Sequence, residues 1–333
     1  MAGPARAEAA RPPRAGTLQP LETNSPASLS PNPIIGQMIG QVQSSILYGY
    51  VAGLSGEQPV SVGGASVTLT TRSTSSAAAI AQATQYAFEH FAALGLPVAY
   101  HTWSFNGGVR RNVVATQAGA NPGCLYLLAA HIDDASETPG TLAPGADDNA
   151  SGVAGVFAAA EILSRYRFAC SLQYVIFSGE EQGLLGSEAY ARDAALRGDP
   201  ILGVINLDMI AFNTAGSAAT MEMDIRSGPE GVKDQALSTM ITGVIQAYQL
   251  NLIPLVYASN DDGSDQYSFW VSGFPALLMI EDWDNHTPHY HKTTDRISTL
   301  DFAYFAEMTK AVVGAAAHLA RPAHEVFLPF LRR

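Results

Sequence analysis

His131 and Asp133 stand directly after an apolar run at residues 124–130. The run is typical of a buried strand, and side chains two residues apart on extended backbone project to the same side. The imidazole could therefore bind a metal ion while the carboxylate orients it, because a metal-bound histidine commonly donates its other ring N–H to a carboxylate. A His-x-Asp motif alone is not specific, since a lone histidine is more often a surface or core residue.

A turn with two acidic residues, Asp147 and Asp148, leads into a predicted helix. Aspartate or asparagine at a helix start commonly caps the free backbone N–H groups. Capping requires only one of these side chains, and Asn149 could serve equally well. It does not explain the presence of a second carboxylate. Ser151 does not fit a Gly-x-Ser-x-Gly nucleophile turn, because Asn149 and Val153 occupy the two glycine positions. Capping alone and capping combined with metal binding both stay open at this point.

Glu180 and Glu181 follow an apolar, strand-like run at residues 172–177. Neighbouring side chains on extended backbone point to opposite sides, so one carboxylate could bind metal while the other faces a bound water. Two like charges this close are costly unless a cation compensates them. A solvated acidic pair is the alternative, and the buried strand before the pair favours the metal site.

Asp208 interrupts an otherwise apolar strand, and a buried aspartate needs a partner. Three histidines, His286, His289 and His291, lie close together in a loop, with Asp295 four residues after the last. This density favours metal binding over a tract of solvated histidines. Imidazoles and carboxylates at successive strand ends, without a thiolate, suit zinc, with cobalt and manganese as substitutes.

The elements that must position these residues alternate along the chain. Helices are predicted at about 33–53, 75–94, 151–166, 183–196, 229–250 and 300–319, and strands at 98–104, 112–116, 124–130, 172–177, 201–210 and 276–280. Such alternation predicts an α/β fold with three layers, in which helices cover both faces of a mainly parallel twisted sheet. Sites in open sheets of this kind form at the carboxyl ends of the strands, where the candidate ligands fall.

The 333 residues, 47% of them hydrophobic, favour one large domain at 33–322. Residues 1–32 are predicted to be a disordered tail and residues 323–333 a C-terminal extension. The tail is rich in Ala, Pro and Arg and lacks the apolar region of a secretory signal. It could also be the remnant or mis-assigned start of a longer precursor, so secretion stays open.

The charge and hydropathy of the chain exclude two classes of partner. A net charge of −12 with scattered basic residues argues against nucleic-acid binding, which depends on clustered Lys and Arg. No apolar run reaches the roughly 18 residues that a membrane span needs. The oligomeric state is not indicated.

Cys124 and Cys170 are the only cysteines, so a cysteine-rich metal site is excluded. Each lies at or just before the start of a predicted strand. Two unrelated buried thiols are the favoured interpretation, because a disulfide needs specific geometry. A disulfide would form if the two strands are parallel neighbours.

Five motifs in order resemble the co-catalytic zinc exopeptidases of clan MH, of the bacterial leucyl-aminopeptidase type, over about residues 34–320. They are His-x-Asp, Pro-Gly-Ala-Asp-Asp-Asn-x-Ser-Gly, Gly-Glu-Glu-x-Gly-Leu-Leu-Gly-Ser, Asn-Leu-Asp-Met and Tyr-His-x-x-x-Asp. The chain departs from the family at Asn149, where some relatives have Asp, and at Gln266, where the family often has His.

The resemblance implies two Zn²⁺ per chain and peptide substrates with a free amino terminus. It implies that Asp148 bridges the two metals and that Glu180 is the general base, with the Tyr290 hydroxyl stabilising the oxyanion. The remaining ligands would be His131 and Asp208 at one metal and Glu181 and His291 at the other. The resemblance also slightly favours a secreted protein, and it does not indicate the preferred N-terminal side chain.

Three other functions remain. A glutaminyl cyclase-like acyl transferase shares a related fold with a single zinc, whereas the retention of all five ligands favours two metals and hydrolysis. A non-catalytic binding module would not need the ligands and the base. A carboxypeptidase-type exopeptidase would need an arginine for the substrate carboxylate, for which Arg226 or Arg296 could serve.

The acidic segments 260–265 and 281–284 are interpreted as a solvated rim of the site. The alternative is that they bind the ammonium group of a substrate or a calcium ion.

Overall fold

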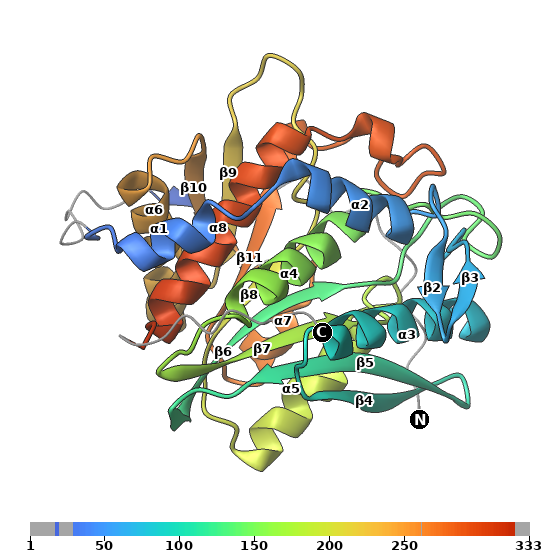
Figure 1. The fold of residues 1–333 in the computed structure, drawn as a ribbon, viewed down its shortest axis with the longest axis horizontal. Helices are drawn as coiled ribbons and strands as arrows, with labels where there is room; N and C mark the ends of the chain where they lie inside the picture. The colour runs from blue at the N-terminus through green and yellow to red at the C-terminus, as the bar shows by residue number, and fades with distance from the viewer. Residues whose placement is uncertain (1–16, 20–28, 261, 324–333) are drawn as a thin grey trace, which may run out of the picture.

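The computed structural model describes residues 17–19, 29–260 and 262–323. Within these ranges nine strands form one sheet in the order β1-β10-β9-β11-β8-β6-β7-β5-β4 (Figure 1). The strands are β1 (Thr17–Gln19), β4 (Val98–Phe105), β5 (Gly108–Gln117), β6 (Asn121–His131), β7 (Cys170–Phe177), β8 (Ile201–Leu207), β9 (Thr220–Ile225), β10 (Ile253–Ala258) and β11 (Ala276–Glu281). A separate antiparallel hairpin consists of β2 (Val60–Val62) and β3 (Ala65–Val67).

The four central strands β11, β8, β6 and β7 run parallel to one another. They are buried along most of their length, as expected for a parallel sheet that is covered on both faces. On either side of this centre, β9 and β5 run antiparallel to their inner neighbours. The predicted mainly parallel sheet is therefore confirmed.

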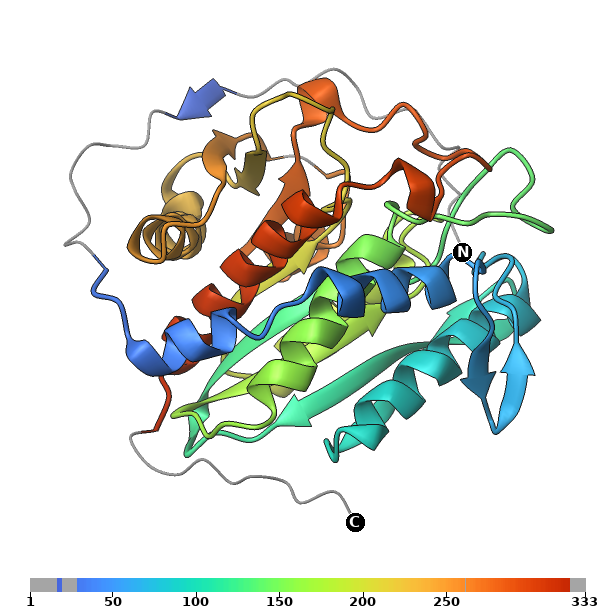
Figure 2. The same cartoon turned by 45° about the horizontal axis from the view of Figure 1, so that its top comes forward.

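Helices cover both faces of the sheet. They are α1 (Pro33–Ile39), α2 (Ser44–Leu54), α3 (Ala77–Ala93), α4 (Ala150–Leu163), α5 (Leu185–Arg197), α6 (Val232–Ala247), α7 (Gln266–Val271) and α8 (Phe302–Ala320). Helices α2, α4 and α8 pack side by side over one face, with α1, α3 and α6 around them (Figure 2). Helices α5 and α7 pack on the other face, where Phe177, Tyr190 and Phe269 form the centre of a second core. The predicted three-layer α/β fold is confirmed.

Capping residues set several helix ends. The side chains of Asn32, Ser76 and Asp301 each accept a backbone N–H in the first turn of α1, α3 and α8. Gly198 ends α5 in the left-handed conformation that glycine adopts without steric cost.

Several elements differ from the prediction. The predicted first helix is two helices, because Gly40 ends α1 and the chain turns before α2 begins after Gln43. The predicted helix at 229–250 begins as a short 3₁₀ turn, η1 (Pro229–Gly231). Strands β9 and β10 and helix α7 were not predicted at all. The acidic residues of β9 hide its strand pattern, and α7 is too short for a helical period to be visible.

Cys124 and Cys170 form a disulfide, so the expectation of two unrelated thiols is wrong. The two residues lie at the starts of β6 and β7, which are parallel neighbours. An irregularity in the register between Asn121 and Leu125 shifts β6 relative to β7 there. The Cα atoms of the two cysteines lie 5.0 Å apart, within the range for a disulfide. Strand register is not readable from sequence, which is why the pairing could not be predicted.

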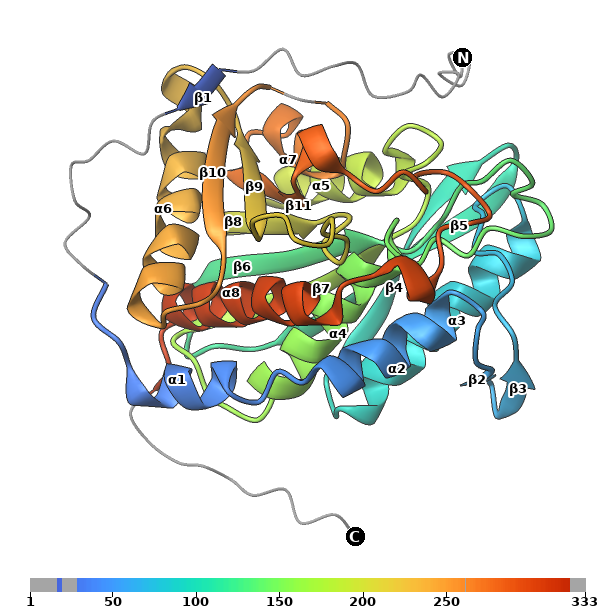
Figure 3. The same cartoon turned by 90° about the horizontal axis from the view of Figure 1, so that it is seen from above.

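Part of the predicted N-terminal tail belongs to the sheet. Residues 17–19 form β1, which pairs antiparallel with β10 at one edge (Figure 3). Residues 1–16 and 20–28 of the predicted tail, and 324–333 of the predicted C-terminal extension, lie outside the described residues. None of the helices in the described part of the chain is long and apolar enough to cross a membrane.

Candidate metal centre

The carboxyl ends of three adjacent parallel strands bring predicted site residues together. His131 is the last residue of β6, Asp208 directly follows β8, and Glu180 and Glu181 follow β7. Because β6 lies between β8 and β7, these side chains meet at one edge of the sheet. Asp148 enters from the turn before α4.

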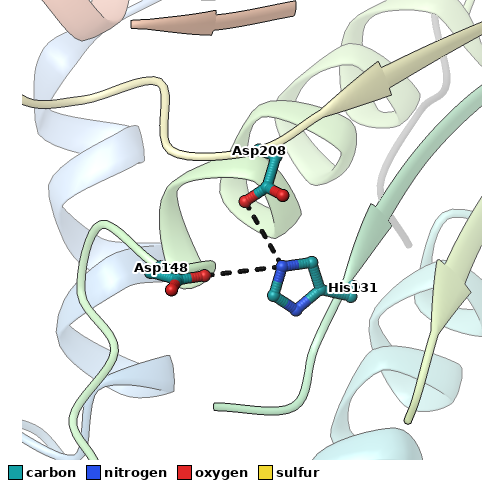
Figure 4. Close-up of side chains that lie close together, drawn as sticks. All are labelled: His131, Asp148 and Asp208. Atoms are coloured by element: carbon teal, nitrogen blue, oxygen red, sulfur yellow. Dashed lines mark hydrogen bonds and ion pairs between the residues drawn. The ribbon is translucent and has the colours of Figure 1, made fainter. Parts of the chain in front are cut away.

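His131 lies between two carboxylates in the first group (Figure 4). Its Nε2 atom is 3.3 Å from Oδ1 of Asp208 and 3.4 Å from Oδ1 of Asp148. The side chains are 1%, 9% and 5% exposed, so the contacts are shielded from solvent. The three ligand atoms lie within 4.8 Å of one another, close enough to share one metal ion.

His291 forms a second group with Asp148 and Glu181. Its Nε2 atom is 3.1 Å from Oδ2 of Asp148 and 3.1 Å from Oε2 of Glu181. The backbone of His291 has a φ of 53°, a left-handed conformation that non-glycine residues rarely adopt and that clusters at functional sites. Asp148 therefore presents one oxygen to each histidine.

The residues on either side of Asp148 have other tasks. Asn149 caps α4, because its Oδ1 accepts the N–H of Gly152 at 2.8 Å. Asp147 accepts the N–H of Ala211 at 3.0 Å. The backbone N–H groups of Asp147 and Asp148 donate to the carboxylate of Asp295 at 3.0–3.1 Å. Capping and site formation thus involve different side chains of the same turn.

Asp133 fixes the turn after β7. Its carboxylate oxygens accept the N–H groups of Glu180 at 3.2 Å and Glu181 at 3.3 Å. The hydrogen-bond partner of His131 Nδ1 is the backbone carbonyl of Asp133 at 3.1 Å, whereas the nearest carboxylate oxygen is 3.9 Å away. The main chain at Asp133 orients the imidazole, and its carboxylate orients the two glutamates.

The charges of these groups need compensation. Burial and the charge of Asp148 raise the pKa of Glu181 to about 8 overall, although His291 opposes the shift. Burial lowers the pKa of His291, but Glu181 and Asp148 raise it to about 11 overall. Among the described residues, Glu181 Oε1 has no hydrogen-bond partner. The raised pKa values mean that Glu181 and His291 hold protons in the absence of another cation. A divalent metal such as zinc fits these imidazole nitrogens and carboxylate oxygens, because its charge would replace those protons.

A pocket opens beside the two groups. It is lined by His131, Asp148, Glu180, Asp208, Met209, Gly263, Ile280, Trp283, Tyr290 and His291. Its apolar members Met209, Ile280 and Trp283 belong to one hydrophobic cluster, against which Tyr290 packs. The ring of Tyr290 stacks on that of His291 with centroids 3.7 Å apart and meets Trp283 edge to face.

Two of the three loop histidines stay outside the metal-binding groups. His286 Nδ1 lies 2.7 Å from the carbonyl of Trp283, and His289 Nδ1 lies 2.9 Å from the hydroxyl of Thr294. Sequence reasoning also missed Ser264, whose hydroxyl donates to Asp208 Oδ2 at 2.7 Å. No local signal marks this serine, because 56 residues separate the two side chains.

Residues 112–316 match the family model of peptidase family M28. The chain belongs to this family. The match begins in β5 and ends in α8, so it contains every candidate ligand of both groups.

Curated relatives of this M28 protein align with a little under two thirds of its length. Leucine aminopeptidase 1 of Trichophyton equinum is 29% identical in an alignment of 225 positions that covers 64% of this chain and 59% of the relative. A protein of Pyrenophora teres f. teres (strain 0-1) named probable zinc metalloprotease is 28% identical over 226 residues, 62% of this chain and 48% of the relative. The chain thus matches about half to three fifths of these relatives.

Solved structures share the fold of the M28 protein at low sequence identity. The LapA aminopeptidase of Legionella pneumophila superposes with a TM-score of 0.71 at 17% identity, covering 86% of this chain and 75% of its own. A glutaminyl cyclase of Bacteroides thetaiotaomicron superposes with a TM-score of 0.65 at 16% identity, covering 83% of this chain and 97% of its own. At such identities the likeness concerns the fold.

Proposed function

We propose that this M28 protein is a zinc-dependent aminopeptidase that binds two zinc ions and removes residues from the free amino terminus of peptides. The observation that carries the proposal is the position of Asp148, whose two oxygens face two different histidines. A carboxylate in that position can bridge two cations. The names of the leucine aminopeptidase and zinc metalloprotease relatives support the activity and the metal.

The chain would hold the two ions with five side chains. His131 and Asp208 would bind one ion, Glu181 and His291 would bind the other, and Asp148 would bind both. When bound, zinc polarises the scissile carbonyl and lowers the pKa of its bound water toward neutrality.

Glu180 and Tyr290 complete the proposed chemistry. Glu180 lines the pocket beside His131, where its carboxylate would accept a proton from the attacking water and pass it to the leaving amine. Burial raises the pKa of Glu180 well above its usual value, which suits a group that must both accept and release a proton. The hydroxyl of Tyr290 would donate a hydrogen bond to the oxyanion.

The pocket suits a substrate ammonium better than a carboxylate. Among the described residues that line it, acidic side chains are present and no Lys or Arg is. Arg226, one candidate for carboxylate binding, pairs with Asp234 at 2.7 Å and also donates to the carbonyl of Phe274. Arg296, the other candidate, is not part of the lining. Peptides with a free amine should be cleaved, and equal turnover of N-acetylated peptides would contradict the aminopeptidase proposal.

A glutaminyl cyclase is the second candidate, because the fold is shared with solved glutaminyl cyclases. Five available ligands favour two ions and hydrolysis over the single zinc of a cyclase. Full activity with one zinc per chain would favour the cyclase instead.

Glu180→Gln tests the proposed general base. The amide keeps the shape of the side chain and cannot accept the proton, so we expect kcat to fall about 100- to 10,000-fold with two zinc ions still bound. Activity on aminoacyl peptides and zinc per chain are the measurements. Glu188→Gln, at an exposed position of α5, is the matched control. Retained activity in Glu180→Gln would refute the assignment.

A further inference from the structure

Arg72 is a completely buried cation in the segment between β3 and α3. Its Nη1 atom lies 3.3 Å from Oδ2 of Asp134, and both side chains are fully inaccessible to solvent. The backbone N–H of Arg72 also donates to the same carboxylate at 2.9–3.0 Å. A buried charge requires such a partner, so the ion pair explains how Arg72 is tolerated. It does not explain where the rest of the guanidinium is directed.

The guanidinium donates to four main-chain carbonyls. Nε binds Ile132 at 2.7 Å, and Nη1 binds Leu54 at 2.6 Å and Pro144 at 2.8 Å. Nη2 binds Gly145 at 3.0 Å. These carbonyls belong to three segments: the end of α2, the chain after β6 and the turn before α4. A planar arginine with donors in a fixed fork can hold three segments at once, which a lysine ammonium cannot.

Two of these segments carry candidate metal ligands. Ile132 directly follows His131, and Gly145 lies three residues before Asp148. A Cβ atom at Gly145 would stand 2.3 Å from the backbone oxygen of Asp148 and 2.8 Å from Arg72 Nη2, so the turn packs tightly against the arginine. The guanidinium therefore spans the gap between the two backbones that bring His131 Nε2 and Asp148 Oδ1 to 3.4 Å.

The other candidate ligands lie further from Arg72. Glu181 is one hydrogen bond removed from it, because its N–H donates to Asp133, the residue between Ile132 and Asp134. The loop that carries His291 donates the N–H of Thr287 to Glu281 at 2.8 Å. Loss of the arginine contacts should thus act first on the group around His131.

We propose that Arg72 is a positioning residue for the metal site of His131, Asp148 and Asp208, because it fixes the spacing between the chain after β6 and the turn before α4. The inference rests on the proposed zinc binding. Arg72 would not touch the substrate or the metal, and its effect would pass through the backbones of its two neighbouring segments.

Zinc affinity of the full chain, measured by competition with a chromophoric chelator, tests this role. Arg72→Lys keeps the charge beside Asp134 and loses the fork of donors, so we expect the affinity for one of the two ions to fall about 10- to 100-fold, as for other outer-shell partners of metal ligands. Arg226→Lys is the matched control, since Arg226 also forms a largely buried ion pair, with Asp234, and its other hydrogen bonds go to Trp270 and Phe274 rather than to the ligand-bearing turns. It should lower the urea midpoint of unfolding and leave zinc affinity unchanged.

A double-mutant cycle separates positioning from general stability. In a His131→Ala background, Arg72→Lys should reduce the remaining zinc affinity by less than threefold, because without His131 the spacing that Arg72 fixes no longer joins two ligands of one ion. An equal loss in both backgrounds, or unchanged affinity in the single variant, would overturn the proposal. Wild-type chain that binds no zinc would instead refute the proposed function.

A second variant covers the case in which Arg72→Lys does not fold. Arg72→Met with Asp134→Asn removes both buried charges together, a change that proteins often tolerate. It also lacks all donors to the four carbonyls, so the same 10- to 100-fold loss for one ion is expected. Full zinc affinity in this folded double variant would overturn the proposal.

Discussion

Asp148 couples the two histidines of the site, because each of its oxygens faces a different imidazole at 3.1–3.4 Å. Its carboxylate is 5% exposed and its backbone N–H is held by Asp295, so it has little freedom to turn toward one group at the expense of the other. The affinities for the two ions should therefore depend on the same side chain.

Asp148→Asn should lower the affinity of the chain for both zinc ions. An amide has one oxygen and no charge, so we expect the affinity for each ion to fall more than about 100-fold, beyond the loss for an outer-shell partner. Zinc per chain after dialysis against a chelator is the measurement. Asp284→Asn, at an exposed position, should keep both ions. A variant that retained one tightly bound zinc would contradict a bridging role.

Much of this site was predictable because ligand motifs follow apolar strands. His131, Glu181 and Asp208 each stand at or after a strand end, which parallel topology alone brings together. The choice between Asp147 and Asp148 was not readable from the residues, because both follow the same turn. The family resemblance points to Asp148, and in the structure Asp147 binds a backbone N–H of a neighbouring loop instead.

Helices α3 and α4 meet through aromatic rings that surround His90. Its imidazole stacks on Phe157 with centroids 4.0 Å apart and meets Phe91 and Tyr50 at steeper angles. Burial lowers the pKa of His90 to about 4, although Glu161 and a backbone contact oppose the shift. The interface between the two helices therefore favours the neutral ring.

The neutral state of His90 predicts a loss of stability in acid. The folded pKa is below the unfolded value near 6.5, so the unfolded chain binds the extra proton first as the pH falls. Between pH 6.5 and about 4 this should cost about 3 kcal/mol. His90→Phe should remove that part of the pH dependence, measured by urea unfolding of metal-free protein. Identical pH profiles for the variant and the wild type would contradict the prediction.

Helices and strands whose apolar residues recur at a regular spacing were predicted from the sequence, and those without such a spacing were not. The regular apolar spacing of α3 and α8 and the apolar runs of β6 and β7 gave bounds within a few residues. Strand β9 carries Glu222 and Asp224 on a buried strand, which contradicts the usual strand pattern. Its position beside β11 depends on long-range pairing that local sequence does not encode.

The disulfide lies at the opposite end of β6 and β7 from the metal centre. Cys124 and Cys170 begin the two strands, whereas His131 ends β6 and Glu180 follows β7. The bridge stabilises the sheet where no ligand is present, and it closes a loop with a sequence separation of 46 residues.

Replacing both cysteines should lower stability without changing the site. By loop-closure entropy, a loop of 46 residues is worth about 4 kcal/mol. We expect Cys124→Ser with Cys170→Ser to reduce the free energy of unfolding in urea by about that amount, while zinc content stays at the wild-type level. A change in zinc content in the folded variant would show that the two ends of the strands are coupled.

The same bridge makes the segment 124–170 a covalent ring, and His131, Asp148 and the whole of α4 lie inside it. The ring also contains the exposed residues 137–141, where a protease can reach the backbone. A single cut there cannot release a fragment, because the two pieces remain joined through sulfur. The nicked chain should migrate as one band on a non-reducing gel and as two after reduction, and the ligands on both sides of the cut would stay tethered to the same sheet.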